Sequence, residues 1–174
     1  LLDKSGYIKL TDFGLSKALV YEDEKALTVC GTPEYLAPEV IKKQGHNRAV
    51  DWWCLGCIIY EMITGFPHFE IKIGWSFSNR FSSNRCNSLM YLMIYQGSPK
   101  LKNLLARLLE KNPKDRIGSA GAAEIREHPW FEKVNWNALQ SRSIKAPFVP
   151  ILASETDTSN FDEDFTSCSV ESYS

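Results

Sequence analysis

The chain has 174 residues, of which 44% are hydrophobic and 24% charged, and its formal net charge is -1 at pH 7. This composition is ordinary for a globular protein, and the near-neutral charge gives no case for nucleic acid or an anionic membrane surface as partner. The longest dense apolar run, residues 89–95, is far shorter than the roughly 20 residues that span a bilayer. We therefore expect no nucleic-acid partner and no membrane span.

The five cysteines predict an intracellular, cytoplasmic protein, because an odd count without a secretory signal favours free thiols in a reducing compartment. Cys54 and Cys57 form a C-x-x-C, but the sequence has no second such motif and no paired histidines to complete a zinc site. Their stretch is strongly apolar, where small thiols are common in the core. We interpret both as structural.

The N-terminal residues predict a strand, a tight turn and a second strand over residues 1–10, because Asp3-Lys4-Ser5-Gly6 has the composition of a reversal. Residues 12–39 show no sustained period. A loop of this length in a compact domain usually has a function.

Three helices are predicted farther along the chain. Residues 49–64 are apolar around most of the helix circumference, which predicts a central, buried helix ended by Gly65 and Pro67. Residues 99–112 carry one stripe of leucines, and residues 120–128 form a short third helix. After about residue 140 the chain is rich in Ser, Thr and Asp, which predicts an extended tail with isolated aromatic anchors.

Asp12-Phe13-Gly14 has two interpretations when it is taken alone. It is either a turn after a strand or a carboxylate at a strand end that binds the magnesium bridging ATP phosphates. Ala37-Pro38-Glu39 closes the long loop at a distance that suits an activation segment, and two spaced motifs are much stronger than one. Two further motifs follow in order: Val50-Asp51-Trp52-Trp53 and Asn112-Pro113-Lys114-Asp115-Arg116-Ile117-Gly118.

With these motifs the chain resembles the C-terminal lobe of an AGC-group serine/threonine protein kinase, and the run Asp157–Phe165 resembles the tail of that group. The resemblance implies a mainly α fold: a large kinase lobe truncated at its N-terminus, with a short β-hairpin and an extended C-terminal tail. It divides the chain into a partial protein kinase domain, residues 1–131, and an AGC C-terminal tail, residues 132–174.

The resemblance implies transfer of the ATP γ-phosphate to Ser or Thr of protein substrates with basic motifs, with ATP and Mg as cofactors. Asp12 would hold the metal, with Thr11 beside it in the nucleotide site. Phe161 would lean on the adenine, with Phe165 next to it. Glu34 and Glu61 match positions that receive substrate arginines, although Glu61 also fits an ordinary solvated helix position.

The same resemblance assigns roles to three residues of the loop, two of them regulatory. Thr28 occupies the position that an upstream activating kinase phosphorylates, and Lys17 is placed to pair with that phosphate. Thr32 would lie near the substrate hydroxyl. For Thr28 the alternative is an ordinary loop threonine.

Three further residues are expected to be structural. Glu39 and Arg116 would form a buried ion pair that ties the activation segment to the lobe. Asp51 would hydrogen-bond the backbone of the catalytic loop.

Several parts of a kinase are missing from the sequence: a G-x-G-x-x-G loop, the strand lysine with its helix glutamate, and the H-R-D loop, which none of the three histidines begins. We therefore expect a kinase fragment that is inactive alone. A non-catalytic docking or regulatory module, or a truncated gene product without function, remains an alternative.

Residues 70–98 depart from the kinase pattern and contain the near-repeat Ser78-Asn79-Arg80-Phe81 and Ser83-Asn84-Arg85-Cys86. The segment is either a lineage-specific insertion or an artefact of gene prediction. We favour the artefact, because local pattern and global fold disagree only there.

Overall fold

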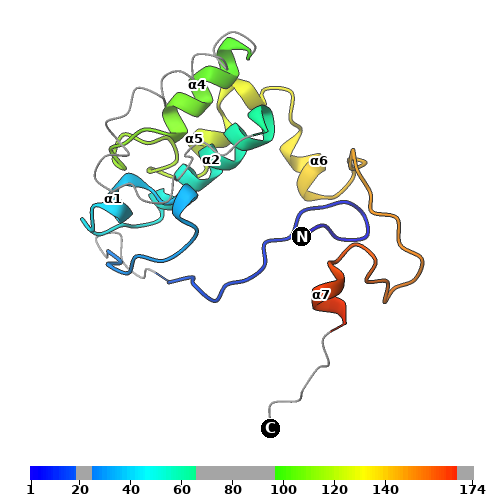
Figure 1. Ribbon diagram of the computed structural model, residues 1–174. Coiled ribbons are helices and arrows are strands. Elements are labelled where there is room, and N and C mark those ends of the chain that lie inside the picture. Colours follow the sequence, from blue (N-terminus) through cyan, green and yellow to red (C-terminus); the bar gives the residue numbers. More distant parts are fainter. Residues whose placement is uncertain (19–24, 66–96, 168–174) are drawn as a thin grey trace. The chain divides into compact units, whose positions relative to one another are not determined.

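The computed structural model describes residues 1–18, 25–65 and 97–167 (Figure 1). The anomalous segment of residues 70–98 lies outside the described residues, except for residues 97 and 98. The chain forms two compact units, Leu1–Phe13 with Asn135–Ser174 and Gly14–Val134, which we describe separately. Among the described residues, no helix has the length and apolarity needed to cross a membrane.

The unit of residues 14–134 is helical, as the sequence predicts (Figure 1). Its longest helix, α2, spans Ala49–Thr64 and ends at Gly65, whose φ of 75° is in the left-handed region that glycine tolerates. These bounds confirm the predicted helix. The shorter elements of the unit are η1 (Pro33–Tyr35), α1 (Pro38–Ile41), α5 (Ala123–Arg126) and η3 (Pro129–Phe131).

Helix α4 spans Pro99–Leu108, so the prediction that it continues to residue 112 is wrong. It begins as its sequence indicates, because the Ser98 side chain accepts a hydrogen bond from the Leu101 N–H at 3.3 Å. It stops early because the chain folds back and supplies other donors. The Ile117 N–H donates to the Arg107 carbonyl, and Arg116 Nε donates to the Glu110 carbonyl.

The predicted helix over residues 120–128 is also shorter than expected, since α5 has four residues. Gly121 has a φ of 143°, which is incompatible with a helix at that position. His128 is extended and Pro129 begins the next short turn. Both ends are therefore fixed by backbone geometry.

Helix α2 lies at the centre of the core of this unit, where three clusters of buried residues meet it. Trp53 and Cys57 pack with Ala37 and Val40 of the preceding segment. Another face packs on α4 and α5, and Tyr60 packs on the leucines of α4. The leucines that α4 buries are Leu101, Leu104, Leu105 and Leu108.

One stripe of α2 departs from the prediction of a helix buried around most of its circumference. Ile58, Met62 and Ile63 are 45%, 72% and 45% exposed. The stripe is apolar, so the composition of the helix alone overestimates how much of it is covered.

The unit of residues 1–13 and 135–174 has little regular structure. The expected N-terminal hairpin is present as a tight turn closed by a single antiparallel bridge between Leu2 and Ile8. Two short helices follow in the C-terminal part, α6 (Trp136–Gln140) and α7 (Glu163–Thr166).

The imidazole of His128 is buried in the helical unit and makes two hydrogen bonds. Its Nδ1 accepts from the Trp130 N–H at 3.2 Å, so the proton sits on Nε2, which donates to Asn103 Oδ1 at 2.9 Å. Burial, and secondarily the charge of Arg107, lowers the pKa of His128 below its ordinary value. The folded protein therefore favours the neutral form of this side chain.

We predict that, because of His128, the free energy of unfolding decreases as the pH falls below about 6.5. In that range the unfolded state binds a proton that the folded state resists. His128→Asn should keep an acceptor for the Trp130 N–H but remove the titration. Urea unfolding of His128→Asn should therefore give a lower free energy of unfolding than the unchanged protein at pH 7.5 and a shallower decline toward pH 5. Asn103→Ala, which keeps the histidine, should retain the steep decline; an equally steep decline in His128→Asn would contradict the prediction.

Candidate functional site

The end of the candidate activation segment is fixed by a buried ion pair. Pro38 at the first position of α1 starts the helix that carries Glu39. Arg116 lies in the turn after α4, and its Nη1 and Nη2 donate to Glu39 Oε1 at 2.8 Å and Oε2 at 3.0 Å. Glu39 is 3% exposed and Arg116 1%. The structure thus brings together the two residues expected to tie the segment to the lobe.

The guanidinium of Arg116 has further partners besides the carboxylate. Nη1 donates to the Ala49 carbonyl at 2.7 Å, and Nε donates to the Glu110 carbonyl at 3.0 Å. Its carbon lies 5.2 Å from the centroid of the Trp53 ring, within cation–π range. The two charges are out of water but well satisfied, so removing one leaves the other buried without its counterion.

We predict that Glu39→Gln lowers the free energy of unfolding by about 3–5 kcal/mol, because it leaves the Arg116 charge buried and unneutralised. Chemical denaturation should measure this loss. The matched control is Glu132→Gln, which breaks an exposed pair with Lys100 and should have little effect. Equal effects of the two substitutions would contradict the special role of the buried pair.

Tyr35 and Glu61 form the second contact of the site. The Tyr35 hydroxyl donates to Glu61 Oε2 at 2.6 Å, and both residues are half-buried. This bond to a carboxylate is the main cause that raises the pKa of Tyr35. The bond holds one carboxylate oxygen of Glu61 in place. Glu34, which is also half-buried, directly precedes Tyr35 in the sequence.

Sequence reasoning missed Tyr35 as the partner of Glu61. The two residues are 26 positions apart, one in η1 and one in α2. No local pattern joins them, so only the packing of η1 on α2 could have revealed the contact.

Lys17 and Asp51 line one surface groove of the helical unit. Neighbouring protein raises the pKa of Asp51 by desolvation, although the charge of His46 opposes this shift. Exposed cations outnumber carboxylates along the groove, which makes it a predominantly basic surface, whereas Arg116 is buried and neutralised by Glu39. The charged residues lining it are Lys17, Lys25, Arg48, Arg107, Lys114, Arg116, Asp51, Asp115 and Glu124.

Thr28 and Thr32 are exposed, and neither lines that groove. The backbone near Thr28 is held by an antiparallel bridge between Ala26 and His46. The structure therefore leaves both hydroxyls open to solvent without bringing Thr28 into the groove that Lys17 lines.

Asp12, Thr11 and Phe161 belong to the other unit, and all three are exposed. Asp12 has a φ of 59°, a left-handed conformation that is uncommon outside glycine and costs energy, and such outliers cluster at functional sites. Its carboxylate is a hard oxygen ligand, and magnesium is usually bound by one or two carboxylates together with substrate phosphates. Asp12 therefore fits the metal expected there.

The described part of the chain shows no metal cage made by the protein alone. Among the described residues, no group of three or more His, Cys, Asp or Glu side chains could hold an ion. The two cysteines of the C-x-x-C have other surroundings: Cys57 is buried, and the Cys54 thiol donates to the Tyr35 carbonyl at 3.4 Å. Both thiols thus have a place in the packing.

Comparison with known proteins identifies two families. The protein kinase domain matches residues 1–131, and the protein kinase C terminal domain matches residues 152–172. The human cAMP-dependent protein kinase catalytic subunit PRKX is 43% identical over 93% of this chain and 44% of its own length. The serine/threonine-protein kinase gad8 of Schizosaccharomyces pombe is 43% identical over 96% of the chain and 28% of its own length.

A third relative, the ribosomal protein S6 kinase alpha-4 of Mus musculus, is 44% identical over 95% of the chain and 22% of its own length. The chain thus spans less than half the length of each of these three relatives.

Proposed function

The chain belongs to the protein kinase family, in its AGC serine/threonine group, and from this premise we propose that it forms part of an enzyme that phosphorylates Ser or Thr of proteins. The observation that carries the proposal is the buried Glu39–Arg116 pair, which anchors the end of the activation segment on the helical unit. Phosphoryl transfer depends mainly on positioning and electrostatics. An anchored segment supports both.

Kinases of this family use ATP with magnesium, and we assign this chain a share of that site. Asp12 would hold the metal, which neutralises charge on the phosphates, and Thr11 would lie beside the nucleotide. Phe161 would lie against the adenine, with Phe165 near it. The strained Asp12 backbone and the exposure of the Phe161 ring support these roles.

We further propose that an upstream kinase phosphorylates Thr28 and that Lys17 pairs with the phosphate. The exposure of Thr28 supports access by another enzyme. Thr32 would lie near the substrate hydroxyl, and Asp51 would hold the backbone of a catalytic loop. We also propose that the protein is intracellular. Residues 1–131 would form a partial kinase domain and residues 132–174 its C-terminal tail.

Glu34 and Glu61 would bind arginine side chains of a basic substrate. Glu61 keeps one carboxylate oxygen beyond the bond from Tyr35, and its incomplete burial leaves it reachable. A carboxylate that is already oriented loses little entropy when it pairs with an arginine. The Tyr35–Glu61 bond therefore supports a role in recognition as well as in packing.

We predict that Glu61→Gln weakens binding of an arginine-containing peptide by about tenfold, the cost of one charged hydrogen bond. Fluorescence anisotropy with a labelled peptide would measure the affinity, and a peptide with alanine for arginine should not respond. Tyr35→Phe keeps the carboxylate and loses only its orienting bond, so it should weaken binding less than Glu61→Gln does. If Tyr35→Phe weakens binding as much as Glu61→Gln, Glu61 acts only through its structural bond.

The phosphoryl-transfer role is tested in a chimera that joins the preceding part of the human relative to this chain. We expect the chimera to phosphorylate a basic peptide with ATP and magnesium, and Asp12→Asn to reduce the rate by at least about 100-fold, as loss of electrostatic stabilisation typically does. Lys4→Ala, at an exposed side chain, is the control. An inactive chimera, or full activity in Asp12→Asn, would overturn the proposal.

A further inference from the structure

Arg142 has an unusual backbone at the end of α6. Its φ is 58° in the position after the C-cap Ser141, where helices usually place glycine. Its N–H donates to the Leu139 carbonyl at 3.1 Å, and the Ser143 N–H donates to the Ala138 carbonyl at 2.9 Å. This is a Schellman ending, and a residue other than glycine pays a conformational cost there. A contact made by the side chain can offset this cost.

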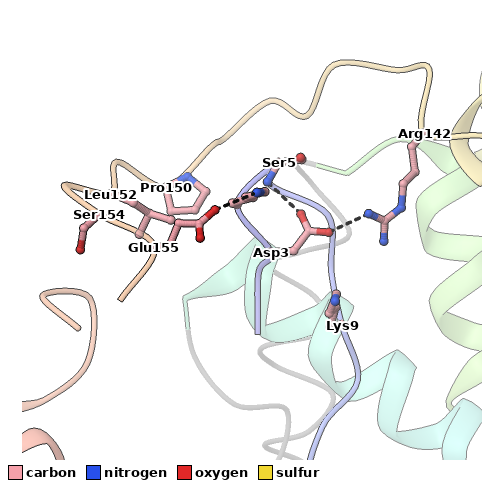
Figure 2. Close-up of a pocket in the computed structure, with 9 residues that line it drawn as sticks. Asp3, Ser5, Lys9, Arg142, Pro150, Leu152, Ser154 and Glu155 are labelled. Carbon is pink, nitrogen blue, oxygen red and sulfur yellow. Dashed lines mark hydrogen bonds and ion pairs between the residues drawn. The ribbon is translucent and has the colours of Figure 1, made fainter. Parts of the chain in front are cut away.

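The side chain of Arg142 binds the N-terminal turn (Figure 2). Its Nη1 lies 3.0 Å from Asp3 Oδ2, and its guanidinium lies 5.3 Å from the centroid of the Tyr7 ring. The Tyr7 hydroxyl donates to the Ile144 carbonyl, two residues beyond Arg142. We call the Asp3–Arg142 pair with the Tyr7 ring the latch.

Asp3 divides its two carboxylate oxygens between two tasks. Oδ1 accepts from the Ser5 N–H at 2.9 Å and the Tyr7 N–H at 3.0 Å, which builds the turn, and Oδ2 faces Arg142. The bond from the Tyr7 N–H, more than the charge of Arg142, lowers the pKa of Asp3. The turn thus holds the carboxylate as an anion, with Oδ2 facing Arg142.

Contacts within the same unit continue from the latch along the tail. Gly6, with a φ of 81°, lies so close to the Phe148 carbonyl that a Cβ at this position would overlap its oxygen. Asp157 then accepts from the Ala153 N–H at 2.7 Å and the Ser159 N–H at 2.9 Å. The Phe161 N–H donates to the Thr158 carbonyl. The tail therefore touches the turn at Phe148 and then forms local turns of its own as far as the Phe161 backbone.

We propose that Arg142 is a positioning residue: the latch holds the tail from residue 142 against the N-terminal turn and so sets the path that carries Phe161. The consequence for nucleotide binding rests on the proposed function, whereas the latch itself does not. The left-handed backbone of Arg142 aims the side chain at Asp3, and this use offsets its conformational cost.

The test is chymotrypsin cleavage after Phe148 in the full chain, measured without nucleotide, because cleavage tracks the population of the opened tail. Asp3→Asn keeps Oδ1 for the turn but loses the ion pair, and we expect about fivefold faster cleavage. Arg142→Gly relieves the strain at the end of α6 but should also accelerate cleavage. Arg142→Lys, which retains the charge, should restore part of the protection.

Two controls separate the latch from general loosening. Lys4→Ala removes a 3.7 Å pair with Glu155 in the same turn, where both side chains are largely exposed, and should leave cleavage unchanged. Cleavage after Trp130, in the other unit, should be the same in all variants. Unchanged cleavage after Phe148 in Arg142→Gly and Asp3→Asn would overturn the proposal, because a residue that only ends a helix is replaced by glycine without loss. Failure of the kinase chimera would leave this readout unaffected.

Discussion

The helical unit depends on one guanidinium. Arg116 binds Glu39 of α1, the first residue of α2 through its carbonyl, and the carbonyl of Glu110 after α4, and it stacks on Trp53. A planar group with five donors can satisfy partners in several directions at once, which an ammonium group does not do in a fixed geometry. The early end of α4 follows from this, because the chain must turn back to deliver Arg116 to the core.

The unit of residues 1–13 and 135–174 also contains a carboxylate–guanidinium pair, but this pair is exposed and so loses less hydration. Asp3 and Arg142 also pair a carboxylate with a guanidinium near an aromatic ring, but the arginine side chain there remains 56% exposed. Water screens an exposed pair, so the contact is weaker and easier to open than the buried one.

The sequence predicted features that arise from local pattern. The apolar period and Gly65 predicted the bounds of α2, because both depend on neighbouring residues only. The end of α4 was missed because it depends on Arg116 and Ile117, which are farther along the chain. The pairing of Glu39 with Arg116 was expected from family resemblance, whereas the Tyr35–Glu61 and Asp3–Arg142 contacts join distant residues for which no periodic signal exists.

Exposure separates the acidic residues of the site by what they can do. Glu39 has both oxygens occupied by Arg116 and is closed to solvent, so it cannot receive a substrate and its role is structural. Glu61 is only half-buried and shares one oxygen with Tyr35, so it can still accept a cation. Asp12 is exposed and has a left-handed backbone, so its carboxylate is accessible for the metal-binding role proposed for it. The fold thus gives carboxylates of similar chemistry different shares of water, which accounts for the anchoring role of Glu39 and is consistent with the recognition and metal-binding roles proposed for Glu61 and Asp12.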